Sequence, residues 1–129
     1  MQAVDTNVLV RILIDDPKEM NQVHIARRYA KRAGQLFVTQ IVQVELVWVM
    51  DAAYDLNKSE VISVLKHMQD NEAFFLQNES QYAMALHHYQ TKNVDFSDCL
   101  ILAECHQEKC EVVTFDNKFS RLPEVHLLQ

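Results

Sequence analysis

The sequence contains almost no glycine. Gly34 is the only glycine among the 129 residues. The phosphate-binding loops of P-loop enzymes and of dinucleotide-binding folds need several glycines, because their backbone must approach the phosphate closely. Both classes are therefore excluded, and any phosphate chemistry must be performed by side chains or by a metal ion.

Cysteine, long apolar runs and positive charge are also scarce. The cysteines, Cys99, Cys105 and Cys110, are odd in number and form no Cys-x-x-Cys pair, so we expect buried or free thiols in a reducing cytoplasm rather than disulfides or a zinc site. No apolar run has the length of a membrane span, and the start of the chain lacks the features of a signal peptide. The net charge of −6 argues against a broad nucleic-acid surface, although it does not exclude a local one.

The chain does have enough apolar residues for a core. They make up 49% of 129 residues, which predicts a single domain spanning residues 1–129. Short apolar strands alternate with helices, and this order predicts an α/β fold in which helices cover both faces of a parallel sheet. The predicted strands are 2–4, 36–39, 73–76, 110–115 and 125–128, and the predicted helices are 8–14, 17–33, 40–54, 59–69, 79–91 and 95–107.

Three polar residues separate two apolar runs near the start of the chain. Asp5, Thr6 and Asn7 follow the strand at 2–4 and precede the first helix. An Asp here can cap that helix, or it can supply a carboxylate at the strand end, where α/β folds place their chemistry. We expect Asp5 to end the strand and bind a metal ion, while Thr6 or Asn7 caps the helix.

The predicted helix 40–54 is apolar almost all round and carries Glu45 in its middle. Such a helix is expected to be mostly buried. A buried carboxylate without a partner is strongly destabilising. Glu45 is therefore expected to pair with a cation such as Arg11, to be protonated, or to bind a metal ion.

Three further acidic residues lie at element boundaries. Asp95 and Asp98 stand at the start of an apolar helix, which Asp95 or Ser97 can cap. Asp116 lies just past an apolar strand, in a segment that is also typical of a turn.

These acidic residues are predicted to converge. The carboxyl ends of parallel strands share one edge of a sheet; Asp5 and Asp116 follow such ends, and Glu45 and Asp98 lie on helices that begin there. Four carboxylates brought together repel one another, which raises their pKa values unless cations bind. An all-oxygen site suits Mg²⁺ or Mn²⁺ rather than zinc, and acidic sites of this kind hydrolyse phosphodiester bonds.

Four segments together resemble the motifs of PIN-domain ribonucleases, in particular the VapC toxins of toxin–antitoxin pairs. They are VDTNVLVR at 4–11, VELVWVM at 44–50, DFSDCLILAE at 95–104 and TFDNKFSRL at 114–122. The resemblance covers essentially the whole chain. It implies a three-layer α/β/α sandwich, a Mg²⁺- or Mn²⁺-dependent endoribonuclease, inhibition by a VapB-like antitoxin and a homodimer.

The resemblance also assigns residues. It implies an acidic, metal-binding site of Asp5, Glu45, Asp98 and Asp116, supported by Asn7, Thr114 and Asp95. Arg11 and Lys118 flank these motifs and are the predicted RNA contacts. The three cysteines depart from the common pattern of the family. This departure leaves the acidic site intact, but it raises the question of whether thiol reagents or oxidants affect the protein. The alternative is a catalytically silent PIN-fold module that binds other proteins.

Overall fold

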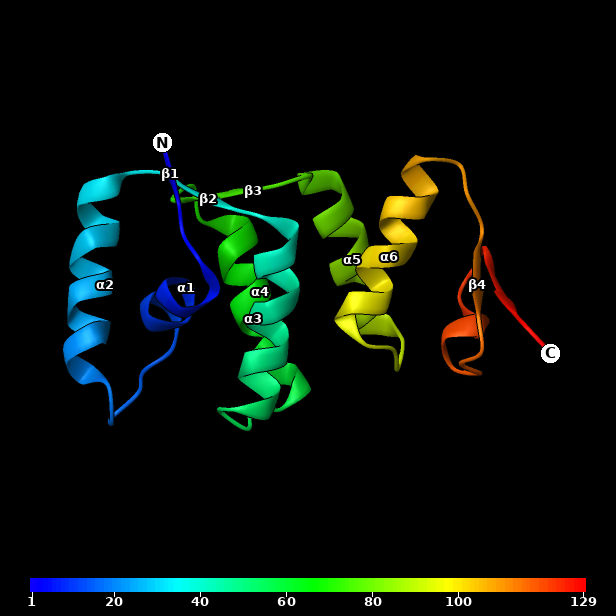
Figure 1. Ribbon diagram of the computed structural model, residues 1–129, viewed down its shortest axis with the longest axis horizontal. Coiled ribbons are helices and arrows are strands. Elements are labelled where there is room, and N and C mark those ends of the chain that lie inside the picture. Colours follow the sequence, from blue (N-terminus) through cyan, green and yellow to red (C-terminus); the bar gives the residue numbers. More distant parts are fainter. The chain divides into compact units, whose positions relative to one another are not determined.

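Two parallel sheets form in the computed structural model, which describes residues 1–129 (Figure 1). The chain divides into two units, Met1–Gln77 and Asn78–Gln129, and each unit has one sheet and its own helices. Each predicted strand and helix has a counterpart in the structure. None of the helices combines the length and the apolar character that crossing a membrane requires.

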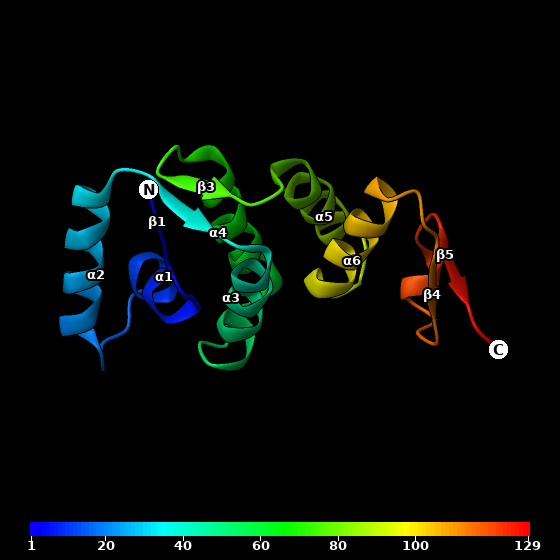
Figure 2. The same ribbon diagram turned by 45° about the horizontal axis from the view of Figure 1, so that its top comes forward.

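The first unit has a three-stranded parallel sheet in the order β1-β2-β3. Gln2 pairs with Leu36, and Leu36 pairs with Phe74, so the strands run side by side in one direction (Figure 2). The strands are β1 (Gln2–Ala3), β2 (Leu36–Val38) and β3 (Phe74–Leu76), and the helices are α1 (Thr6–Leu13), α2 (Met20–Ala33), α3 (Gln40–Ala52) and α4 (Lys58–Asp70).

Local signals set several helix boundaries in this unit. Thr39 caps α3 by accepting a 3.3 Å hydrogen bond from the backbone N–H of Val42, as predicted. Gly34 follows α2 with a φ of 77°, a conformation that glycine adopts readily. The predicted start of α2 at Pro17 was wrong, because Asp16 accepts a 3.0 Å hydrogen bond from the N–H of Lys18 and forms a turn there instead.

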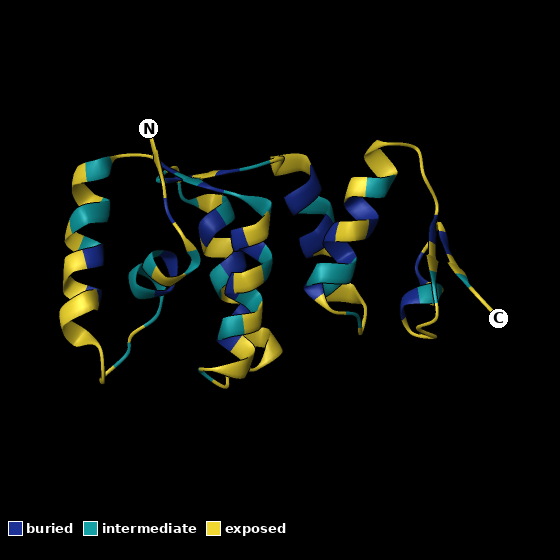
Figure 3. Ribbon diagram, in the orientation of Figure 1, coloured by how far each residue is buried: buried dark blue, intermediate teal, exposed yellow.

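Apolar side chains of β2, α1, α3 and α4 form the core of the first unit. Leu9, Leu36, Leu46, Leu65 and Met68 are completely buried. Buried and exposed residues alternate along these helices, since each helix packs through one face (Figure 3).

The second unit contains α5 (Glu79–Thr91), α6 (Phe96–Gln107), β4 (Val112–Thr114), the 3₁₀ helix η1 (Phe119–Arg121) and β5 (Val125–Leu127). β4 and β5 are parallel. The rings of Tyr82 and Tyr89 in α5 lie 6.1 and 5.8 Å from the ring of Phe96 in α6. A second cluster packs Leu102 of α6 against Val112, Phe119, Leu122 and Val125.

Candidate functional site

Asp5 stands where β1 ends and α1 begins. The pairing of β1 with β2 continues to Val4, whose N–H donates a 3.2 Å hydrogen bond to the carbonyl of Phe37. Asp5 Oδ1 then accepts a 3.0 Å hydrogen bond from the N–H of Val8 and so caps α1. The expectation that Thr6 or Asn7 would cap this helix was therefore wrong. The cap uses one carboxylate oxygen, and the exposed side chain keeps the other available for a ligand.

Thr6 connects the start of α1 to Glu45 in the middle of α3. The Thr6 hydroxyl donates a 2.8 Å hydrogen bond to Oε1 of Glu45. Thr6 directly follows Asp5, so this bond brings the turn that carries Asp5 together with the Glu45 carboxylate. The structure thus joins two of the predicted acidic positions through a residue that the sequence had suggested only as a cap.

The expected burial of α3 was wrong on one side of the helix. Glu45 is exposed, and so are Ile41 and Trp48, at 74% and 70%. These residues lie about one turn before and after Glu45, so they share its face of the helix. Apolar composition all round a helix does not say which face packs, and the sheet and neighbouring helices cover only the opposite face, with Leu46 and Met50.

Gln43 attaches α3 to the ends of two strands. Its side-chain Nε2 donates to the carbonyl oxygens of Val38 and Gln77, at 3.2 and 3.3 Å. Gln43 is completely buried, and its Oε1 has no hydrogen-bond partner. These bonds fix the first turns of α3 at the carboxyl ends of β2 and β3, and so help to place Glu45.

The second unit brings Asp98 near two other carboxylates. Asp98 lies in the first turn of α6 and is partly buried. Burial raises the pKa of Asp98, and the negative charges of Asp95 and Asp116 raise it further. Asp95 occupies the cap position of α6 without a side-chain cap bond. This accumulation of like charge is one that a bound cation would relieve.

Asp116 orders the turn that follows β4. Its Oδ1 accepts hydrogen bonds from the N–H groups of Lys118 and Phe119, at 2.8 and 3.2 Å. The Thr114 hydroxyl accepts a 3.0 Å bond from the N–H of Asp116. Lys118 is exposed beside this carboxylate.

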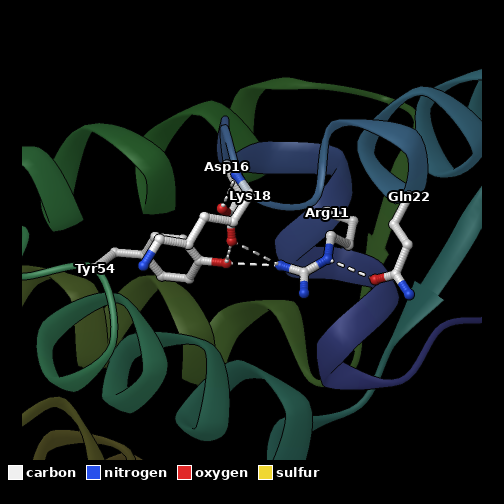
Figure 4. A network of polar contacts seen from close by, with 5 residues as sticks. All are labelled: Arg11, Asp16, Lys18, Gln22 and Tyr54. Atoms are coloured by element: carbon white, nitrogen blue, oxygen red, sulfur yellow. Dashed lines mark hydrogen bonds and ion pairs between the residues drawn. The ribbon is translucent and has the colours of Figure 1, made fainter.

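Arg11 is part of a polar network at the other end of α1 (Figure 4). Its Nη1 donates to the Tyr54 hydroxyl at 2.7 Å and lies 3.4 Å from Oδ2 of Asp16, and its Nε donates to Gln22 at 2.9 Å. The Tyr54 hydroxyl donates a 2.8 Å bond to Asp16. Arg11 therefore pairs with Asp16. The expected alternative, an ion pair between Arg11 and Glu45, is not formed.

A hollow of about 770 Å³ adjoins Asp5 in the first unit. Asn7 and Arg11 line it together with the apolar side chains of Val8 and Ile25 and with Tyr29. Its lining is mainly apolar and includes one carboxylate, that of Asp5.

The four predicted acidic residues have side chains of the kind that bind hard cations. Neither unit alone assembles three carboxylate, imidazole or thiol side chains in one metal-binding group. Asp5 and Glu45 belong to the first unit, and Asp98 and Asp116 belong to the second. All four offer oxygen, the donor that Mg²⁺ and Mn²⁺ prefer.

Comparisons with known proteins agree with this description. The family model described as PIN domain matches residues 3–125. A VapC ribonuclease of Aquifex aeolicus (strain VF5) is 23% identical over 124 residues, which is 95% of this chain and 92% of that protein. The matches extend across both units, and they confirm the resemblance and the α/β fold class inferred from the sequence.

Proposed function

Because the chain belongs to the PIN domain family, we propose that it is an endoribonuclease that requires Mg²⁺ or Mn²⁺ and acts as the toxin of a toxin–antitoxin pair. The observation that carries the proposal is the Glu45 carboxylate, exposed and hydrogen-bonded by Thr6 next to Asp5. The full-length similarity to a VapC ribonuclease supports it. We further propose that the two units act as one functional domain.

The residues assigned to hold the metal ion are Asp5, Glu45, Asp98 and Asp116. When bound, Mg²⁺ or Mn²⁺ supplies an activated water and neutralises charge on the phosphodiester. Thr6 occupies Oε1 of Glu45 and fixes the carboxylate, which leaves Oε2 for a ligand. Asn7, Thr114 and Asp95 are assigned supporting roles, and the bond from the Asp116 N–H to Thr114 fits such a role.

RNA contact is assigned to basic residues near the acids. Lys118 is exposed in the turn formed by Asp116, where its ammonium group can pair with a phosphate. Arg11 was predicted in the same role, but its guanidinium already contacts Asp16, Tyr54 and Gln22. We therefore propose that Lys118 contributes more to RNA binding than Arg11.

The proposed partner is a small VapB-like antitoxin. The hollow beside Asp5 would receive an apolar segment of it, and an Arg or Lys of that segment would pair with the acidic residues. A homodimer in the cytoplasm is also part of the proposal, and the three cysteines, none of which forms a disulfide, are compatible with a reducing compartment.

Cleavage of RNA by the purified full chain tests the proposed activity. We expect cleavage in Mg²⁺ or Mn²⁺, none in EDTA, and recovery when the metal is restored. Glu45→Gln should abolish cleavage without unfolding, whereas Glu72→Gln, at another exposed glutamate, should not. Cleavage that survives full chelation would contradict the metal requirement, and an inactive wild-type protein that binds a partner would favour the silent interaction module.

Co-expression with a small neighbouring gene tests the partner. We expect the two proteins to purify together, with nuclease activity recovered once the partner is removed. Unrestrained activity that cells tolerate would contradict the toxin assignment but leave the nuclease assignment standing.

A further inference from the structure

The C-terminal end of α6 closes in a Schellman motif that contains two cysteines. The N–H of Cys110 donates a 2.8 Å hydrogen bond to the carbonyl of Cys105, and the N–H of Lys109 donates a 3.1 Å bond to the carbonyl of His106. Lys109 has a φ of 59°, the left-handed conformation that this motif requires. The two bonds turn the chain back over the last turn of α6.

This motif places Cys105 and Cys110 at its first and last positions, and the Cys110 thiol donates a 3.5 Å hydrogen bond to the carbonyl of Glu108. The residues at these two positions of a Schellman motif frequently contact each other, usually as apolar side chains. Here both are free thiols, and Cys105 is half-buried against the core around Leu102 while Cys110 is exposed. Burial raises the pKa of Cys105, and the neighbouring Cys110 contributes to the same shift, which is consistent with thiols in close proximity.

We propose that Cys105 and Cys110 are a redox modification site that forms an intramolecular disulfide when a peroxide is present. The proposal does not depend on the nuclease function. The third cysteine, Cys99, is buried within α6 and takes no part.

The two thiols have different roles in the reaction. The exposed Cys110 meets the oxidant first, and its Sγ displaces water from hydrogen peroxide to become a sulfenic acid. Sγ of Cys105 then attacks that sulfur, the S–S bond forms, and a second water leaves with the Cys105 proton. Two thiols lose two electrons and two protons, and one peroxide is reduced to two waters.

The disulfide would fasten the last turn of α6 to the segment that enters β4. The cross-link closes a short ring in a conformation already held by two backbone hydrogen bonds. It therefore restricts the unfolded chain with little rearrangement of the folded one, and the oxidised protein should melt at a higher temperature.

The test treats the full chain with hydrogen peroxide, then unfolds it and labels the remaining thiols with a maleimide. We expect labelling to fall from three thiols to one, a mass loss of two hydrogens, and a peptide map that joins Cys105 to Cys110. Cys105→Ser and Cys110→Ser should not form the cross-link, and a reductant should restore all three thiols.

Wild-type protein alone keeps the test decisive if a variant folds poorly. Three thiols that all remain reactive, a bond to Cys99, or a disulfide that links two chains would each overturn the proposal. A lower Tm after cross-linking would also overturn it, because it would mean that the native geometry does not accommodate the bond.

Discussion

Thr6 donates a 2.8 Å hydrogen bond to Oε1 of Glu45, a residue 39 positions further along the chain. Asp5 precedes Thr6 and accepts the capping bond of α1 from Val8. The dipeptide therefore places one carboxylate at the helix start and orients a second from α3. A single turn of backbone thus sets the positions of two acidic side chains.

Replacing Thr6 by Val should impair RNA cleavage through Glu45. A hydrogen bond to a charged group contributes about 1.5–3 kcal/mol, so we expect the rate to fall roughly ten- to a hundred-fold. Thr6→Ser keeps the hydroxyl and should retain most of the activity. Cleavage rates measured over a range of Mg²⁺ concentrations check this, because a displaced carboxylate should also raise the Mg²⁺ requirement. An unchanged cleavage rate and an unchanged Mg²⁺ requirement in Thr6→Val would show that Thr6 does not act through Glu45.

Asp98→Asn should stabilise the metal-free protein while removing activity. Burial and the charges of Asp95 and Asp116 disfavour the ionised Asp98 side chain, and a neutral amide avoids that cost. Asp98 is partly exposed and solvent screens much of the effect, so we expect Tm to rise by only about 1–3 °C at pH 7. Thermal melts in EDTA measure it, with Glu104→Gln on the same helix as a control. A loss of stability would instead assign Asp98 a structural role.

The stabilisation by Asp98→Asn should depend on pH. The folded state raises the pKa of Asp98, so the wild-type protein loses stability as the pH rises from the ordinary carboxyl pKa through the raised one. The difference between variant and wild type should be largest at neutral pH. It should vanish at a pH well below about 3.9, where the carboxyl is protonated in both states.

Tyr54→Phe should destabilise the first unit at neutral pH. The Tyr54 hydroxyl contacts both Asp16 and Arg11, and its hydrogen bond is the main cause that lowers the pKa of Asp16. We expect Tm to fall by about 2–5 °C. A carboxyl group whose pKa is lowered by folding stabilises the protein at any pH above its pKa in the unfolded chain. That stabilisation is lost as the pH falls through its pKa in the folded protein. The deficit should therefore shrink in acid, which melts at several pH values will show.

Arg11→Ala should lower Tm, as Tyr54→Phe does. Its effect on the free energy of unfolding should exceed its effect on the free energy of RNA binding. Arg28→Ala, at an exposed arginine of α2, is the matched control. If Arg11→Ala weakened RNA binding with unchanged stability, Arg11 would be an RNA contact, as its sequence position suggested.

Lys118→Ala should weaken RNA binding through loss of one phosphate contact. Lys118 is exposed in the Asp116 turn, so its replacement should leave the fold intact. The slope of log affinity against log salt should become shallower by about one. Binding titrations in EDTA at several salt concentrations measure it. Lys66→Ala on α4 should have no effect, and equal slopes for both variants would rule out this contact.

The sequence predicted the order and type of the elements because their boundaries depend on local chemistry. Thr39 caps α3 and Gly34 ends α2 through bonds and conformations available within a few residues. Asp5 was also correctly expected at a strand end, since the change from apolar to polar residues marks that boundary.

Tertiary pairings could not be predicted in this way. The bond between Thr6 and Glu45 and the contact of Arg11 with Tyr54 join residues far apart in the sequence, and no local pattern specifies them. The composition of α3 likewise indicated burial without saying that Glu45 would be exposed. Polar side chains with the same helix propensity can have different partners, because the tertiary fold decides which residues lie next to them.

Trp48 gives the protein an optical reporter of its own. It is the only tryptophan in the chain, and it is 70% exposed about one turn after Glu45. An indole in water emits at longer wavelength than a shielded one and is open to quenching by iodide. Anything that covers this face of α3, whether an RNA, a partner protein or a second copy, should shift the emission to the blue and protect it from quenching. Occupancy beside Glu45 can then be followed in unlabelled protein by fluorescence alone.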